Sequence, residues 1–393
     1  MEDFVFHVPT KFIFGRGAEG KAGSEIKALG AGRVLIHYGG GSCVRSGLLK
    51  RVEDSLDAAG IAHTSLGGVK PNPRLSLIRE GIELARKEKC DFVLAVGGGS
   101  VIDSAKGIAC GAASDGDVWD FYDGVRKPEA ALPVGSVLTI AAAGSESSWA
   151  SVVTREEDKR KRSLHAQILV PRFALLNPEF TFTLPAWQTA CGATDMMAHV
   201  LERYFSPSEN VDLTDRLCEA ILLSVMENLP RALRNPSDYD ARANLMWAGT
   251  IAHNNTCGVG RVQDWGSHAL EHELSGLYDC SHGAGLAVIF PAWMTWMLDH
   301  GAKPGRLRDL AVRVFGVEDK GQGDRAIAEE GIRRFREFLH ECGMPVTFAE
   351  LGAKEEDIPR LVDMLEPEKR HIGNFGIIDR AAAAAIYKLA CRG

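Results

Sequence analysis

Long apolar runs, a secretion signal and an excess of basic residues are all absent from this chain of 393 residues. No run of 18 or more apolar residues occurs, so we expect no helix that spans a membrane. The N-terminal stretch MEDFVFHVPTKFIFG is acidic and lacks the basic region and the apolar core of a signal peptide. The net charge of −7 gives no reason to expect nucleic acid as a partner.

Cysteine pairs are missing as well. The nine cysteines are scattered, odd in number and include no C-x-x-C pair, which favours reduced thiols in a cytoplasm over a disulfide framework. Apolar residues make up 45% and charged residues 25% of the chain, which is typical of a globular protein. We therefore expect a cytoplasmic globular protein with neither a membrane nor nucleic acid as a partner.

The first half of the chain alternates short apolar runs with amphipathic stretches. Apolar runs at 34–38, 91–96 and 134–140 predict strands, and the first two are each followed by GGGS. The stretch at 75–89 has the period of a helix. Strand, glycine loop, helix and strand in this order indicate βαβ units with a parallel sheet.

The second half has a different pattern. The segment LNPEFTFTLP at 176–185 holds two prolines and no periodicity, so it predicts a break between domains. Beyond it we expect helices and no strand, the clearest helical segments being 212–233, 238–254, 325–342 and 379–391. Because the chain is long for a single core, we predict two domains, an α/β domain over residues 1–183 and an all-helical domain over 184–393.

A quarter of the twelve histidines lie in one short region, DWGSHALEHELSGLYDCSHGAGLAV at 264–288. It contains His268, His272 and His282. In GATDMMAHVLERY, Asp195 and His199 are four residues apart, which places them on one face of a helix. The pair Asp195 and His199 alone, or the pair His268 and His272 alone, is more often a surface pair or a core group. Asp195, His199, His268 and His282 together offer one carboxylate and three imidazoles in a single domain, which suit iron, zinc, cobalt or nickel. No cysteine joins the set, which argues against a structural zinc site.

Two glycine loops follow predicted strands. GGGSVIDSAKGIA at 97–109 opens a helix, and GGGS recurs at 39–42. Glycine lets the backbone approach a phosphate closely, and a helix N-terminus offers unpaired N–H groups. Neither loop is the G-x-G-x-x-G fingerprint of dinucleotide sites. Their repetition nevertheless predicts a nucleotide across two strand ends of a Rossmann-like parallel sheet.

These stretches together resemble the iron-containing (group III) alcohol dehydrogenases, in their NADP-dependent, butanol-dehydrogenase-like branch. The resemblance covers nearly the whole chain, and its most specific stretch is HALEHELSGLYDCSHGAGLA at 268–287. It implies an N-terminal nucleotide domain, a C-terminal helical metal domain and an active site in the cleft between them. The metal ligands implied by the resemblance are the same four residues, Asp195, His199, His268 and His282. By resemblance Fe²⁺ comes first, with Zn²⁺ or Mn²⁺ as alternatives.

The resemblance also implies the residues that bind the cofactor. The diphosphate is expected over Gly98, Gly99 and Ser100, with Asp103 nearby. Further contacts are expected from Thr139 near the nicotinamide, Lys161 at a ribose, Asn72 at the adenosine side, and Gly40, Gly41, Ser42 and Ser148. The chain departs from the family pattern at 142–146, where AAGSE stands for the more usual GTGSE, and at Ser148 and Trp149. These departures bear on the nicotinamide pocket rather than on the class of enzyme.

The chemistry expected of such a site is hydride transfer between an alcohol and NADP⁺, or from NADPH to an aldehyde. A metal ion would lower the pKa of the alcohol oxygen in one direction and polarise the carbonyl group in the other. We predict His272 as the catalytic proton relay, because it lies one helical turn from His268 and histidine titrates near neutral pH. A structural role for His272 is equally open. Trp149, Trp265 and Cys257 suggest a pocket for an aliphatic chain.

The choice of cofactor is predicted from the end of the strand at 34–38. No acidic residue follows this strand to accept the ribose 2′-hydroxyl of NAD, and Arg45 can bind a 2′-phosphate, so we expect NADP(H) rather than NAD(H). Alternative functions are a dehydroquinate-synthase-like or glycerol-dehydrogenase-like enzyme, a hydrolase that uses metal-bound water, and a metal-stabilised sensor. The glycine loops disfavour the last two. We expect a homodimer that acts on a small alcohol or aldehyde.

Overall fold

The computed structural model describes residues 1–301 and 304–392. The described chain forms two compact units. The α/β unit comprises His7–Leu184 and Pro236–Thr250, and the helical unit comprises Met1–Phe6, Pro185–Asn235 and the residues from Ile251 onward. Of the helices in the described ranges, none is both long and apolar enough to cross a membrane.

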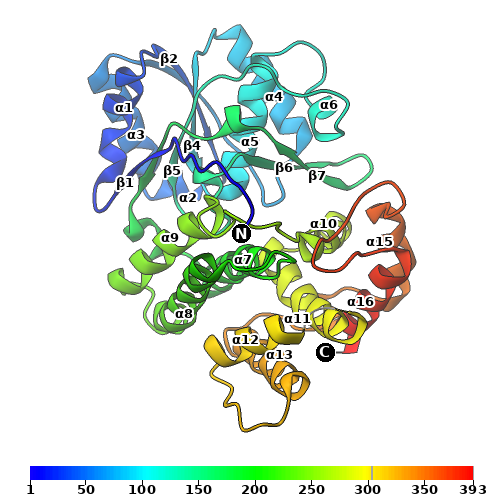
Figure 1. The fold of residues 1–393 in the computed structure, drawn as a ribbon. Helices are drawn as coiled ribbons and strands as arrows, with labels where there is room; N and C mark the ends of the chain where they lie inside the picture. Colours follow the sequence, from blue (N-terminus) through cyan, green and yellow to red (C-terminus); the bar gives the residue numbers. More distant parts are fainter. Residues whose placement is uncertain (302–303, 393) are drawn as a thin grey trace. The chain divides into compact units, whose positions relative to one another are not determined.

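The α/β unit is built on a six-stranded parallel sheet with the order β1-β8-β5-β4-β2-β3 (Figure 1). The strands are β1 (Lys11–Phe14), β2 (Arg33–Tyr38), β3 (Ala62–Leu66), β4 (Phe92–Gly97), β5 (Val134–Leu138) and β8 (Phe173–Leu176). The three strands predicted from the sequence are β2, β4 and β5. The antiparallel hairpin of β6 (Ala150–Arg155) and β7 (Arg160–His165) was not predicted.

Side chains that alternate along the strands face two separate cores. On β2 and β4, Val34, Ile36 and Leu94 face one core, whereas Leu35 and Val93 face the other. The first core is covered by α1 (Ala22–Ala28) and α3 (Leu48–Ala59), and the second by α4 (Leu75–Lys87) and α5 (Gly99–Ala112) (Figure 1). The short helices of this unit are η1 (Ala18–Lys21), α2 (Ser42–Arg45), α6 (Trp119–Tyr122), η2 (Ser145–Ser147), η3 (Gln167–Leu169) and η4 (Pro178–Thr181).

Residues 236–250 belong to the α/β unit although helices of the other unit flank them in sequence. They form most of α9 (Tyr239–His253). The Trp247 ring lies 5.6 Å from the Phe12 ring in β1, and Thr250 donates a 2.6 Å hydrogen bond to Glu146. The residues that make these contacts are far apart in the sequence, so helical periodicity alone could not assign this segment to a unit.

The helical unit surrounds α11 (His282–His300), which is buried along most of its length. It packs against α7 (Ala186–Tyr204), α10 (Gly266–Tyr278), α13 (Asp324–Glu341) and α16 (Arg380–Arg392) (Figure 1). The remaining helices are α8 (Asp212–Arg234), α12 (Pro304–Arg313), α14 (Phe348–Leu351), η5 (Glu355–Asp357) and α15 (Ile358–Leu365). Among residues 185–301 and 304–392 no strand is formed, as the sequence predicts.

Candidate active site

Three helices of the helical unit bring the four candidate metal ligands together. Asp195 and His199 lie one turn apart on α7, His268 is in the first turn of α10, and His282 opens α11. The ligand atoms of Asp195, His268 and His282 all lie within 4.8 Å of one another. Nε2 of His282 is 3.8 Å from Oδ1 of Asp195.

His199 completes the set from the side. Its Nδ1 is 3.5 Å from Oδ1 of Asp195, and its ring stacks on the ring of His268 with centroids 4.8 Å apart. It lies outside the 4.8 Å group formed by the other three side chains. Four residues expected from the sequence to share one site are therefore neighbours, with three of them in the closer group.

Two buried glutamates orient two of these imidazoles. Glu202, fully buried on α7, accepts a 2.7 Å hydrogen bond from Nδ1 of His268. Glu271, one turn into α10, accepts a hydrogen bond from Nδ1 of His282. Because a carboxylate can only accept, Nδ1 of each imidazole is the donor in these two bonds. A histidine that binds a metal ion through one ring nitrogen usually donates a hydrogen bond from the other ring nitrogen to a carboxylate, a backbone carbonyl or water.

Glu202 also caps the N-terminus of α10, although it belongs to α7. Its carboxylate accepts hydrogen bonds from the backbone N–H of Trp265 at 2.6 Å and of His268 at 3.0 Å, and from the Ser267 hydroxyl at 2.5 Å. A helix N-terminus leaves backbone N–H groups unpaired, and a carboxylate is well suited to bind them. One side chain thus sets both the start of α10 and the ring of His268.

The donor atoms have the properties that a divalent metal needs. Nε2 of His268 and Nδ1 of His199 are buried and have no hydrogen-bond partner among the described residues. Burial lowers the pKa of His199 well below its usual value, and the nearby His253 and His268 lower it further. His199 is therefore a neutral imidazole near pH 7, which is the form that binds metals. A carboxylate with three imidazoles fits iron, zinc or manganese.

The helices that carry Asp195 and His282 approach each other very closely. A Cβ atom added to Gly283, next to His282 on α11, would lie 2.0 Å from the backbone oxygen of Cys191 on α7. Only glycine permits this approach. Gly283 therefore sets the separation between the two helices at the candidate metal site.

The predicted cofactor residues gather at one edge of the sheet in the α/β unit. Neighbouring parallel strands β2, β4 and β5 end there, followed by Gly40–Ser42, by Gly98–Ser100 and by Thr139. Gly98 precedes the first turn of α5, and Thr139 donates its backbone N–H to the carbonyl of Gly97 at 3.1 Å. Free N–H groups at the start of α5 can bind a diphosphate.

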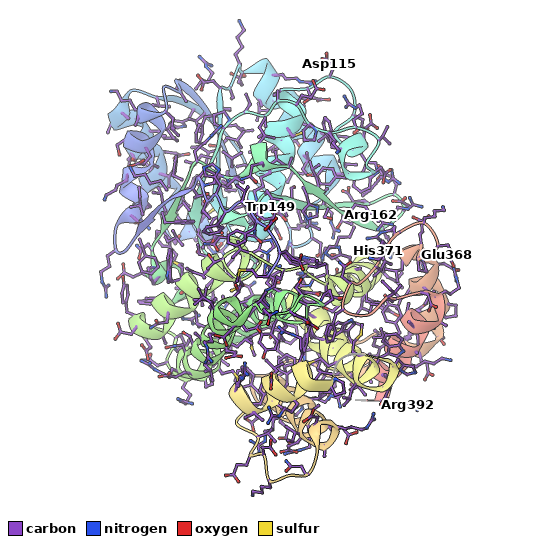
Figure 2. All side chains as sticks on the ribbon, in the orientation of Figure 1. Asp115, Trp149, Arg162, Glu368, His371 and Arg392 are labelled. Carbon is purple, nitrogen blue, oxygen red and sulfur yellow. The ribbon has the colours of Figure 1, made fainter. Side chains whose placement is uncertain are left out.

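The β6–β7 hairpin brings Asn72 and Lys161 to the same part of this unit. Thr154 of β6 pairs with Lys161 of β7 and bonds through its N–H to the carbonyl of Pro73, next to Asn72. Both Asn72 and Lys161 are buried. Trp149, just before β6, and Arg162, in β7, are marked in Figure 2.

Asp103 forms hydrogen bonds with residues that follow β5. Its Oδ1 accepts the Ser145 hydroxyl at 2.5 Å, and its Oδ2 accepts the backbone N–H of Val152 at 3.0 Å. Ser148 is buried, and its carbonyl accepts a 2.9 Å hydrogen bond from Lys106. Asp103 and Ser148, both expected at the cofactor, thus join one hydrogen-bonded network with Lys106.

Comparison with known proteins matches both halves of the chain to one family. Residues 9–178 match the model described as iron-containing alcohol dehydrogenase, and residues 189–391 match the C-terminal model of the Fe-containing alcohol dehydrogenase family. The chain belongs to the iron-containing alcohol dehydrogenases. It is therefore an oxidoreductase, and the fold predicted from the resemblance is confirmed.

Relatives in this family align over almost their full length. The probable NADH-dependent butanol dehydrogenase 2 of Bacillus subtilis is 42% identical over 390 residues, which cover 99% of each chain. The NADPH-dependent aldehyde reductase YqhD of Escherichia coli is 37% identical over 369 residues, or 93% of each chain. The crystal structure of NADH-dependent butanol dehydrogenase A from Thermotoga maritima superposes with a TM-score of 0.96 at 42% identity, over 100% of this chain and 99% of that one.

Besides the two glutamates, His253 and Arg203 lie at this dehydrogenase's site and were not singled out from the sequence. The ring of His253, in the last turn of α9, lies 4.1 Å from the ring of His199. Buried Arg203 donates hydrogen bonds to Nδ1 of His253 at 3.1 Å and to the carbonyl of His199 at 2.6 Å. Its guanidinium also lies over the ring of Trp265. The i, i+4 spacing of His199 and Arg203 was a signal in the sequence, whereas His253 carried none.

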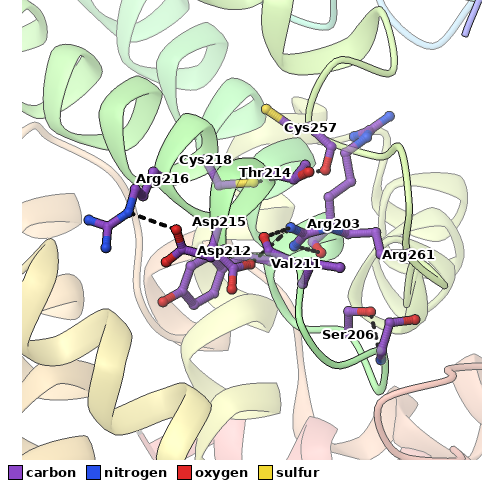
Figure 3. Close-up of polar contacts among 12 residues, drawn as sticks. Arg203, Ser206, Val211, Asp212, Thr214, Asp215, Arg216, Cys218, Cys257 and Arg261 are labelled. Atoms are coloured by element: carbon purple, nitrogen blue, oxygen red, sulfur yellow. Dashed lines mark hydrogen bonds and ion pairs between the residues drawn. The ribbon is translucent and has the colours of Figure 1, made fainter. Parts of the chain in front are cut away.

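The remaining aromatic and polar groups near α10 have varied roles. Trp265 lies beside His268, with ring centroids 5.0 Å apart. The His272 ring is 5.5 Å from the His282 ring. Cys257 is fully buried against Cys218, next to the hydrogen bond from Arg261 to the carbonyl of Arg203 (Figure 3). Cys257 therefore belongs to the core of the helical unit.

Proposed function

We propose that this enzyme interconverts primary aliphatic alcohols and aldehydes by hydride transfer to or from NADP(H), with Fe²⁺ in the site of α7, α10 and α11. The observation that carries the proposal is the cluster of three imidazoles around Asp195, two of which donate from Nδ1 to buried glutamates. Relatives named butanol dehydrogenase and aldehyde reductase support the same class of substrate.

Each group has a separate task in this proposal. Asp195, His199, His268 and His282 would hold the ion, which supplies a Lewis acid for the alcohol or carbonyl oxygen. Glu202 and Glu271 would keep the imidazoles of His268 and His282 in the tautomer that binds. The first N–H groups of α5 would bind the diphosphate.

The test is turnover followed at 340 nm, with butanol and NADP⁺ or butanal and NADPH, on protein loaded with Fe²⁺, Zn²⁺ or Mn²⁺. We expect His268→Ala and His282→Ala to lose metal and turnover while keeping wild-type circular dichroism. His340→Ala, which changes an exposed histidine of α13, is the matched control. Full metal content with near-normal turnover in either ligand variant would refute the assignment. Metal-dependent ester or phosphate hydrolysis without any nicotinamide turnover would favour a hydrolase.

Preference for NADPH is the finer part of the proposal. No acid follows β2, and the Arg45 guanidinium folds back over Gly41, where it lies 2.5 Å from the position of an added Cβ. This arrangement supports binding of a 2′-phosphate. Relatives are named for both cofactors, so family membership alone does not favour either.

Gly40→Asp tests this preference. A Cβ at Gly40 meets no atom within 4 Å, so the substitution adds a carboxylate without a clash. The carboxylate repels a 2′-phosphate and accepts a bond from a 2′-hydroxyl, so the ratio of kcat/KM for NADPH to that for NADH should fall at least about tenfold. A wild type that uses NADH as well as NADPH, or an unchanged ratio in the variant, would show that the 2′-phosphate is bound elsewhere.

We also propose that the enzyme works as a homodimer in the cytoplasm. None of the nine cysteines, all within the described ranges, forms a disulfide bond, which supports a reducing compartment. Phe4, Val5 and Phe6 expose apolar side chains near the N-terminus, and such patches often mark an interface. Light scattering at micromolar concentration should give twice the chain mass of 42.6 kDa; a monomer at that concentration would contradict the dimer.

A further inference from the structure

Lys106 is a fully buried lysine in the α/β unit, and its charge is enclosed by the protein. Its Nζ lies within hydrogen-bond distance of three backbone carbonyls, those of Ser145 at 2.7 Å, Ser148 at 2.9 Å and Ala150 at 2.7 Å. The hydroxyl of Ser145 is 2.9 Å away. All these oxygens come from one short segment, residues 145–150, which therefore curves around the ammonium group.

Asp103, one helical turn before Lys106 on α5, holds the two ends of the same segment. Its carboxylate accepts the Ser145 hydroxyl and the backbone N–H of Val152. Its carbonyl accepts the Ser151 hydroxyl at 2.8 Å. Lys106 and Asp103 thus fasten residues 145–152 to α5 through side-chain contacts that span about 40 residues of sequence.

A buried ammonium group is costly unless its environment replaces water. Taking an ion into the interior costs several kcal/mol after relaxation, and burial lowers the pKa of Lys106 to about 8, against the raising effect of Asp103 and Glu146. The group is therefore mainly charged near pH 7. Without it, the carbonyls of Ser145, Ser148 and Ala150 would converge with no donor between them. The conformation of this segment thus depends on the lysine.

The position of the segment in the sheet indicates what it faces. Strand order places β4 between β2 and β5. If the diphosphate lies at the start of α5, after β4, and the adenosine ribose lies at the end of β2, an extended dinucleotide directs its nicotinamide toward the end of β5. Residues 139–149 follow β5, and a Cβ at Gly99 would lie 3.3 Å from Cβ of Ala143. The chain that leads into the segment therefore lies against the start of α5, on the side where the nicotinamide half of the cofactor is expected.

We propose that Lys106 is a positioning residue that holds residues 145–150 in the shape that receives the nicotinamide end of the cofactor. The inference rests on the proposed cofactor site. Lys106 itself is fully enclosed, so it acts through the segment and contacts neither cofactor nor substrate. The diphosphate end binds at the first turn of α5, two turns away, and does not depend on it.

The experiment compares two ligands that differ only in the nicotinamide. Dissociation constants for NADPH and for 2′-phospho-ADP-ribose, which lacks nicotinamide, are measured by fluorescence and calorimetry on the metal-loaded enzyme. For Lys106→Met we expect NADPH affinity to fall at least about tenfold and the affinity for 2′-phospho-ADP-ribose to stay within about twofold of wild type. The metal content, measured in the same samples, should not change.

Two further variants keep the test open if Lys106→Met folds poorly. Ser145→Ala removes one hydroxyl shared by Asp103 and Lys106, and should weaken NADPH binding in the same direction by a smaller factor. Ser104→Ala is the matched control, because Ser104 is a fully buried residue of the same helix that bonds to His37 and not to the segment. We expect it to lower the melting temperature without changing either dissociation constant.

The outcomes separate the inference from the proposed function. If wild-type enzyme binds neither NADPH nor NADH, the proposed function fails and the inference with it. If the wild type binds and Lys106→Met and Ser145→Ala weaken both ligands equally, or neither, Lys106 has a purely structural role and only the inference is overturned. Selective loss of NADPH binding supports it.

Discussion

Replacing Gly283 with alanine tests how the helices set the metal site. An added Cβ would lie 2.0 Å from the backbone oxygen of Cys191, 2.7 Å from its carbonyl carbon and 2.9 Å from its Cα. All three are backbone atoms of α7, so no side chain can move aside, and α7 and α11 must separate by more than about 1 Å to restore ordinary contact. Overpacking of this kind costs about 1–3 kcal/mol.

The displacement falls between two candidate ligands. His282 precedes Gly283 on α11, and Asp195 lies one turn after Cys191 on α7. Metal–ligand distances tolerate changes of only about 0.2 Å. We therefore expect Gly283→Ala to lower metal affinity at least about tenfold, comparable to the loss of an outer partner of a ligand, and to lower the melting temperature by several degrees.

The assay is metal content after dialysis against a graded chelator, together with thermal unfolding of the metal-free protein. Gly305→Ala is the control, because Gly305 also lies in a helix of this unit and an added Cβ meets nothing within 4 Å. Alanine there should be neutral or slightly stabilising. Gly283→Ala protein that keeps its metal at wild-type chelator concentrations would refute the argument that this contact sets the site.

Three further predictions concern His37, Glu202 and His272. Burial lowers the pKa of His37 to about 4, below the unfolded value of 6.5, so the folded state binds fewer protons than the unfolded state. The free energy of unfolding should therefore fall on the order of 3 kcal/mol as the pH drops from 6.5 to 4. Urea unfolding of wild type and His37→Gln over this pH range checks the prediction, and equal pH slopes would contradict it. Glu202→Gln should lower metal affinity about 10–100-fold, because an amide can donate to Nδ1 of His268 and disturb its tautomer; unchanged chelator resistance would count against that role. His272→Ala should keep its metal but lose about 10²–10⁴-fold in turnover if His272 is the proton relay, whereas unchanged kcat would leave it a structural residue.

Local patterns predicted the nucleotide half of the fold well. The apolar runs before each GGGS are β2 and β4, and the helix opened by the second loop is α5. These signals are local, because strand alternation and glycine loops depend on neighbouring residues. The hairpin of β6 and β7 was missed. Its second strand reads RKRSLH, whose basic residues do not alternate with apolar ones as a half-buried strand does.

Part of the candidate metal site could also be predicted from local patterns in the sequence. Helix geometry alone places Asp195 and His199 on one face, and the chemistry of imidazole and carboxylate suggested that His268 and His282 join them. The role of Glu202 and Glu271 as hydrogen-bond partners of the histidine rings was not predicted. Glu202 reaches His268 across 66 residues of sequence, and no period reveals a contact over that separation.

The sequence by itself determined the class of protein, the order of its elements and the residue types available for a metal and a nucleotide. These follow from hydrophobic period, glycine loops and family motifs, which are properties of neighbouring residues. Only the tertiary structure decided that Glu202 and Glu271 orient the imidazoles, that Gly283 brings α7 against α11, and that Lys106 lies inside a cage of carbonyls. Each of these depends on packing between segments distant in sequence, where shape and burial choose the partner.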